Sequence, residues 1–89
     1  MSFYQIKYKK KAEKFIRKHK VEGIKFVKAF IEISENFENI KKYDIKKYIC
    51  EENNFFRLRL GKYRAIFEVK QKEIVIIVCD IDSRGDIYK

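Results

Sequence analysis

Three arginines, Arg57, Arg59 and Arg64, stand close together in the stretch FFRLRLGKYRAIFEV, residues 55–69. A guanidinium group presents planar, paired N–H donors that match the oxygens of a phosphate, so clustered arginines are typical of a phosphate-binding site. Gly61 and Lys62 separate two runs of apolar and aromatic residues. They fit a two-residue type II′ turn, which takes glycine at its first central position. We therefore predict a β-hairpin that carries the three arginines.

The predicted turn fixes the register of this hairpin. Apolar residues then pair in every row of one face, as a core-facing sheet requires: Leu60 with Tyr63, Leu58 with Ala65, and Phe56 with Phe67. The opposite face carries Arg57, Arg59 and Arg64, with Arg59 directly across from Arg64. Like charges in this position are destabilising by a few tenths to ~1 kcal/mol. An anion held between them would reverse the sign, so the register predicts an anion-binding cluster.

The last segment, DIDSRGDIYK (residues 80–89), adds two further candidates, Arg84 and Tyr88. Taken alone, the segment would be read as a fraying terminus. However, Val75, Ile77 and Cys79 are expected to share the face of Arg64 on a strand beside the hairpin. The end of that strand would then bring Arg84 and Tyr88 towards the cluster.

The elements that must position the cluster follow from hydrophobic periodicity. Residues 3–8 alternate as a short first strand, and residues 9–20 form an amphipathic helix with Ala12, Phe15 and Ile16 on one stripe. A second helix covers residues 21–36, and its expected buried arc is Ile24, Val27 and Ile31, widened by Phe26, Phe30, Ile33 and Phe37. Residues 39–54 give no clear prediction. Residues 55–60, 63–69 and 73–81 read as three antiparallel strands.

These elements predict an α+β fold. We expect an N-terminal strand and a two-helix antiparallel hairpin packed on a three- to four-stranded, mainly antiparallel sheet. The chain has 89 residues, of which 46% are hydrophobic, including eight Phe and six Tyr. That length suits a single domain, residues 1–89, and the composition excludes a disordered charged tail.

The charge of the chain agrees with an anionic partner but does not prove one. There are 22 Lys and Arg against 13 Asp and Glu, a formal net charge of +9. Such a basic domain usually meets polyanions, although a lysine-rich solvated surface would give the same number. Lys46, Lys47 and Lys62 are the lysines that we predict to contact a nucleic-acid backbone. Only the position of the arginines favours a polyanionic partner over a solvated surface.

Several other kinds of site are not expected. Without a run of roughly 18 to 20 apolar residues or an apolar signal segment, the protein is predicted to be cytoplasmic, with no membrane partner. Cys50 and Cys79 are far apart and accompany a single histidine, so we expect reduced thiols, no metal site and no cofactor. His19 is expected to be an ordinary exposed residue. Asp80, Asp82 and Asp86 are assigned turn or strand-end roles.

The stretches FFRLRLGKYRAIFEV and EIVIIVCDIDSRGDIYK resemble the second half of the RelE/ParE superfamily of bacterial toxins. In that superfamily a tyrosine–arginine–leucine–arginine strand, a glycine turn, a tyrosine–arginine strand and a closing arginine-to-tyrosine segment recur. DIKKY, residues 44–48, is similar to the lysine-bearing segment that precedes them. The clear match covers about half of the chain, and the order of elements extends it to the whole.

The resemblance implies a RelE-like toxin of a type II toxin–antitoxin system that cleaves mRNA in the ribosomal decoding site. Arg57 and Arg59 fall where the superfamily has paired basic residues that contact the phosphodiester. Arg64 matches the arginine of the tyrosine–arginine strand, Arg84 that of the terminal segment, and Tyr88 the closing aromatic residue. The implied partners are the ribosome, mRNA and an acidic RelB-like antitoxin. Attack by the RNA 2′-hydroxyl would need no metal.

The general base is the open point of this assignment. Arginine does not deprotonate in proteins, so Arg57 and Arg59 cannot accept the proton of the 2′-hydroxyl, and some superfamily members have lysine or histidine there. Tyr88 is the first candidate for the base. Weaker candidates are Glu51, Glu52 and Lys47.

Two other functions remain open. A ParE-like toxin would poison DNA gyrase without cutting nucleic acid, and a basic RNA-binding module would have no catalytic activity. The presence of Arg64, Arg84 and Tyr88 as a set favours the ribonuclease, because a pure binding toxin has no need of them. A simple RNA-binding module would not explain why the arginines converge.

Overall fold

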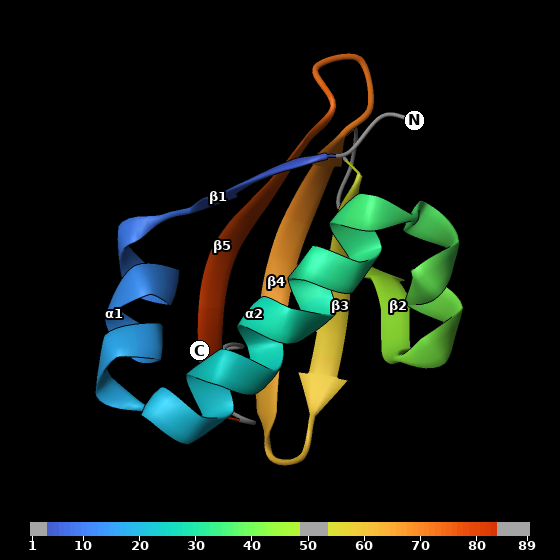
Figure 1. The fold of residues 1–89 in the computed structure, drawn as a ribbon. Helices are drawn as coiled ribbons and strands as arrows, with labels where there is room; N and C mark the ends of the chain where they lie inside the picture. The colour runs from blue at the N-terminus through green and yellow to red at the C-terminus, as the bar shows by residue number, and fades with distance from the viewer. Residues whose placement is uncertain (1–3, 49–53, 84–89) are drawn as a thin grey trace.

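A five-stranded mixed sheet forms the frame of the computed structural model, which describes residues 4–48 and 54–83 (Figure 1). The strands are β1 (Gln5–Tyr8), β2 (Asp44–Tyr48), β3 (Phe55–Leu60), β4 (Tyr63–Lys70) and β5 (Val75–Ser83). Their order across the sheet is β1-β5-β4-β3-β2. β1 runs parallel to β5, and the other neighbours are antiparallel. The α+β prediction is confirmed, and β2 adds one strand from the region that gave no prediction.

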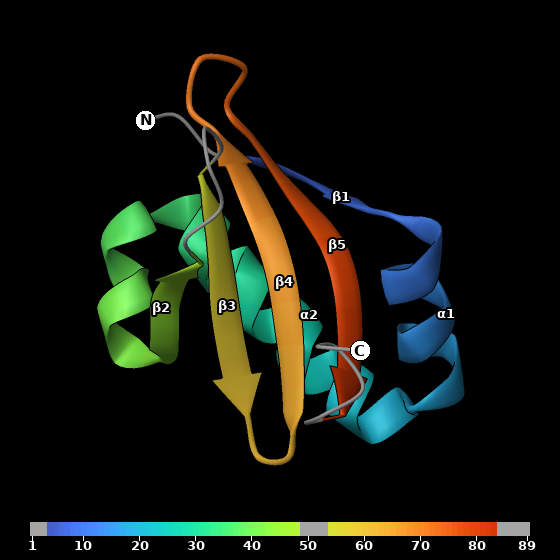
Figure 2. The same ribbon diagram turned by 180° about the vertical axis from the view of Figure 1, so that it is seen from behind.

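The helices cover one face of this sheet and leave the other open. Helix α1 (Lys10–Lys18) and helix α2 (Lys20–Glu35) are joined by His19 alone, and a 3₁₀ helix η1 (Phe37–Lys42) leads into β2. In Figure 1 α2 runs diagonally across the sheet, and Figure 2 shows β3, β4 and β5 from behind with no helix in front of them. No helix in the described ranges is long and apolar enough to cross a membrane.

The core lies between α2 and the covered face of the sheet. Its largest fully buried side chains are Phe26, Phe30, Phe67, Ile33, Leu58, Ile76 and Val78. Phe30 meets Phe67 edge-on, with 5.1 Å between ring centroids, and Phe67 stacks on Phe56 at 5.5 Å. Aromatic pairs in these geometries add to the stability that area burial provides. The helix therefore holds the hairpin through rings of β3 and β4.

The predicted buried arc of α2 is partly wrong. Phe26, Phe30 and Ile33 are buried as expected, but Ile24 is 57% exposed and Ile31 is 44% exposed. Apolar residues surround most of this helix, so periodicity alone did not decide which stripe faces inward. The inward stripe also contains the small residues Gly23 and Ala29, both buried.

At Gly23, α2 lies close to the backbone of α1. A Cβ atom there would lie 2.9 Å from the Cα of Ile16 and 3.0 Å from its carbonyl oxygen. Real Cβ atoms essentially never come this close, and the obstacle is backbone. The single-residue connection between the helices therefore depends on glycine at this position.

Replacing Gly23 with alanine is expected to destabilise the protein. Alanine favours a helix interior by about 1 kcal/mol over glycine. Overpacking against fixed backbone typically costs about 1–3 kcal/mol, which outweighs that gain. The midpoint of urea unfolding should fall relative to wild type, and an increase would show that α1 can move aside without loss.

Candidate functional site

The hairpin of β3 and β4 has the predicted register. Leu60 pairs with Tyr63, and Arg59 lies directly across from Arg64. Gly61 has a φ of +62°, and Lys62 is not in the positive-φ region, which is the pattern of a type II′ turn. Leu58 and Ala65 are fully buried on the covered face, so the three arginines project from the open one.

The arginines converge on one small cavity. It measures about 40 Å³ and is lined by Asp44, Lys46, Arg57, Arg59 and Arg64. Lys46 reaches it because β2 pairs with β3, which places Lys46 opposite Arg57. Three guanidinium groups and one ammonium group thus surround a space that a phosphate oxygen could enter.

Two carboxylates flank the facing arginines. Asp44 lies opposite Arg59 across the β2–β3 pair, with 3.7 Å between Asp44 Oδ2 and Arg59 Nε. Asp82 lies opposite Arg64 across the β4–β5 pair, and one of its carboxylate oxygens accepts a 2.8 Å hydrogen bond from the Ser83 backbone N–H. The row across the open face is therefore Asp44, Arg59, Arg64, Asp82. The ion pair with Asp44 therefore lowers, on the side of Arg59, the like-charge cost inferred from the sequence.

Asp82 reaches the open face because β5 contains an irregularity. Ile66 pairs with Asp80, but the next residue, Phe67, pairs with Val78, so Cys79 is the extra residue. Val75 and Ile77 share the face of Arg64, as predicted. Beyond Cys79 the alternation is reversed, which buries Ile81 and turns Asp82 towards Arg64.

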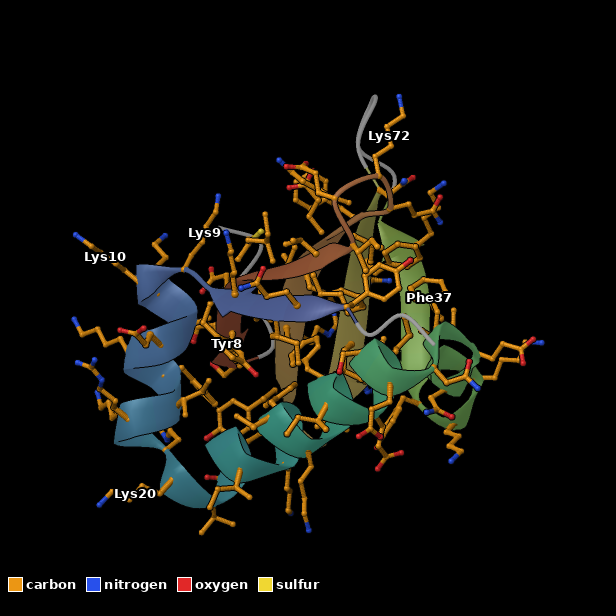
Figure 3. All side chains as sticks on the ribbon, turned by 45° about the horizontal axis from the view of Figure 1, so that its top comes forward. Tyr8, Lys9, Lys10, Lys20, Phe37 and Lys72 are labelled. Atoms are coloured by element: carbon orange, nitrogen blue, oxygen red, sulfur yellow. The ribbon has the colours of Figure 1, made fainter. Side chains whose placement is uncertain are left out.

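The other predicted lysines lie away from this cavity. Lys47 pairs with Phe56 and so shares the face of Ile45, opposite to that of Lys46. Lys62 lies in the hairpin turn, with its Nζ 5.4 Å from the centre of the Tyr63 ring. Further lysines, among them Lys10, Lys20 and Lys72, project outward at other corners of the molecule (Figure 3). Basic charge is spread widely, but Arg57, Arg59 and Arg64 are concentrated at the cavity.

Some predicted site residues fall outside the described ranges. Arg84 and Tyr88 belong to this group, as do Glu51 and Glu52, so their roles remain predictions. His19 was expected to be exposed but is partly buried. The centre of its ring lies 4.6 Å from that of Phe15 and 5.6 Å from that of Tyr63. It packs at the connection between α1 and α2. Within residues 4–48 and 54–83, no group of three His, Cys, Asp or Glu side chains could hold a metal ion.

Among the residues that the structure describes, three titratable groups have a shifted pKa. Burial raises the pKa of the Tyr8 hydroxyl. Burial also raises the pKa of Tyr43, and a hydrogen bond with the Glu32 carboxylate raises it further. The pKa of the Cys79 thiol is raised chiefly by burial. Lys9 opposes this rise, and Glu68 and Asp80 add smaller upward effects.

Cys79 is therefore expected to react slowly with alkylating reagents. Only the thiolate reacts, and a raised pKa lowers its fraction at neutral pH. In a Cys50→Ser variant, which leaves one thiol, iodoacetamide labelling at pH 7.5 should be severalfold slower in the folded protein than in urea. Equal rates would contradict the inferred burial of the thiol.

Comparison with known proteins shows the family to which this chain belongs. The family model described as the ParE toxin of type II toxin–antitoxin systems, parDE, matches residues 6–88. A comparison with curated protein sequences gives no significant match.

Solved structures have the same fold. The archaeal RelE–RelB complex from Pyrococcus horikoshii OT3 is 26% identical, with a TM-score of 0.79 over 93% of this chain and 97% of that chain. The RelB–RelE antitoxin–toxin complex from Methanococcus jannaschii is 29% identical, with a TM-score of 0.70 over 93% and 95%. The isolated E. coli RelE toxin, at 20% identity and a TM-score of 0.71 over 96% and 90%, shares the fold. With a family match over nearly its whole length, the chain belongs to the RelE/ParE superfamily of type II toxin–antitoxin toxins.

Proposed function

We propose that this toxin is a metal-independent endoribonuclease that cleaves mRNA on the ribosome and so inhibits translation. The observation that carries the proposal is the convergence of Arg57, Arg59, Arg64 and Lys46 on one cavity of the open sheet face. A toxin that acted only by binding would not need its cations gathered around a space of this size.

The cluster suits cleavage by the RNA's own 2′-hydroxyl. That oxygen attacks the adjacent phosphorus while its proton passes to a base. The bond from phosphorus to the 5′-oxygen then breaks, and this oxygen takes up a proton from an acid or from water. The products are a 2′,3′-cyclic phosphate and a 5′-hydroxyl. The phosphorane between these states carries extra negative charge, which Arg57, Arg59 and Arg64 would stabilise. Arg84 would extend the cluster. Tyr88 is the first candidate for the base, because arginine cannot fill that role.

The proposed partners follow from charge and from the relatives. The two archaeal relatives were solved as complexes of RelE with RelB. We infer that an antitoxin also neutralises this chain, and that it is acidic because the toxin carries a formal charge of +9. Lys46 and Lys62 are proposed to contact the nucleic-acid backbone, and such contacts weaken with salt.

The test is direct. Purified protein is added to ribosomes carrying a defined messenger, and the 5′ ends of the products are mapped by primer extension. We expect discrete cuts in the decoding site and none in a messenger with a 2′-deoxynucleotide at the scissile position. Intact messenger with active, folded protein would contradict the proposal.

A second function is favoured by the family match itself, which is to the ParE toxins. In this alternative the chain poisons DNA gyrase. An assay of gyrase supercoiling with the same protein preparation discriminates between the two functions. Inhibited supercoiling together with intact messenger would show that the chain poisons gyrase and does not cleave mRNA.

A further inference from the structure

A row of four charged residues crosses the open face of the sheet. Asp44, Arg59, Arg64 and Asp82 lie on β2, β3, β4 and β5, and each is directly opposite the next. Residues directly opposite in an antiparallel pair point to the same face of the sheet. The two arginines at the centre are therefore bounded on each side by a carboxylate.

These carboxylates flank the arginines on which a phosphate would bind, Asp44 through an ion pair with Arg59 and Asp82 through its register position opposite Arg64. Asp44 Oδ2 lies 3.7 Å from Arg59 Nε, and Asp44 lines the same cavity as the three arginines. Carboxylate and phosphate oxygens compete for the same guanidinium donors. The side chains of Asp44 and Arg59 are 51% and 52% exposed, so their attraction is weakened by solvent, and a phosphate can replace it.

We propose that Asp44 and Asp82 are specificity-determining residues, acting as built-in competitors that weaken the binding of free RNA to the arginine cluster. An isolated RNA strand must overcome both carboxylates using the contacts of the cluster alone. An mRNA strand held on the ribosome meets the same competition, but contacts between the toxin and the ribosome add to the binding energy. The inference rests on the proposed function, in which an RNA phosphate enters this cavity.

The test measures the binding of a free RNA strand. The probe is a fluorescein-labelled single-stranded RNA with 2′-O-methyl groups, which the protein cannot cleave by 2′-hydroxyl attack, and affinity is read by fluorescence anisotropy at several salt concentrations. The variants are Asp44→Asn and Asp82→Asn, which retain shape but lose charge. The matched control is Glu68→Gln, on the same face of β4, where the cross-strand neighbours are Phe55 and Ile77.

Each aspartate variant is expected to bind the probe up to about fivefold more tightly, which corresponds to about 1 kcal/mol, the upper value for one exposed ion pair. The dependence of log K on log salt should steepen by up to about 0.7, because a further phosphate is neutralised. Glu68→Gln, which changes the net charge equally, should alter affinity by less than about twofold.

The outcomes separate this inference from the proposed function. Unchanged affinity in both aspartate variants would overturn the inference, and weaker binding by Asp44→Asn would make Asp44 a positioning residue for Arg59 instead. If wild type cleaves messenger on ribosomes while neither variant tightens RNA binding, the inference alone fails. If the variants tighten RNA binding while wild type leaves messenger intact, the cleavage proposal alone fails. Absence of RNA binding by every variant at low salt would overturn the inference.

Discussion

Replacing Arg64 with alanine is expected to lower the rate of messenger cleavage by about 100- to 1000-fold, the usual cost of removing one donor that stabilises transition-state charge. Arg64 lies on a central strand of the sheet, directly across from Arg59, and lines the cavity that Arg57 and Arg59 also line. In the proposed reaction its guanidinium group would therefore contact the same phosphate as theirs. The fall should appear mainly in the single-turnover rate at saturating ribosomes, because charge accumulates in the transition state rather than on binding.

Two variants make this prediction specific to the donors of Arg64. Arg64→Lys keeps the charge but loses the planar paired donors, so its rate should lie between those of wild type and Arg64→Ala. Lys70→Ala removes one positive charge from the same strand, where Lys70 pairs with Glu73 at 3.7 Å. It should cleave within about twofold of wild type, because that charge is far from the cavity and screened. An Arg64→Ala rate within tenfold of wild type would contradict the proposed role.

The hairpin was predictable because its determinants are local. Gly61 supplies the positive φ of the turn, and a two-residue turn leaves one register that pairs apolar residues in every row. The juxtaposition of Arg59 and Arg64 follows from that register without any knowledge of the remaining chain. The helices were found for a similar reason, because apolar residues recur at helical spacing within each of them, such as Ala12 and Phe15 in the first and Phe26 and Phe30 in the second.

The carboxylates escaped prediction because their positions depend on distant segments. Asp44 joins the cluster only because β2 pairs with β3. The sequence of β2, DIKKY, has too few apolar residues to predict a strand. Asp82 faces Arg64 only because Cys79 is an extra residue in β5. With unbroken alternation, Asp82 would point into the core and Ile81 outward. Burial of Ile81 and solvation of Asp82 favour the irregular strand, but that preference becomes visible only once β4 and β5 are aligned.

The site also depends on the covered face of the sheet, which gives the second large prediction. Phe30→Ala should reduce the free energy of unfolding by about 3–5 kcal/mol, the usual cost of deleting a buried phenyl ring. Phe30 is fully buried, and its ring lies edge-on to Phe67 of β4 and to Tyr8 of β1, with centroid distances of 5.1 and 6.3 Å. Its removal would leave a cavity between α2 and two strands. Total stabilities are typically about 5–15 kcal/mol, so the loss would be a large share.

Ile31→Ala is the matched control, because Ile31 is the next residue of the same helix but is 44% exposed. We expect it to cost less than about 1 kcal/mol, as exposed substitutions usually do. Urea unfolding followed by circular dichroism measures both variants with the same probe. Equal losses would mean that α2 packs on the sheet through a different stripe from the one described. If only Phe30→Ala is strongly destabilised, the aromatic contacts on the covered face hold the arginine hairpin in place. Phe30→Ala should then lose cleavage activity at temperatures where Ile31→Ala remains active.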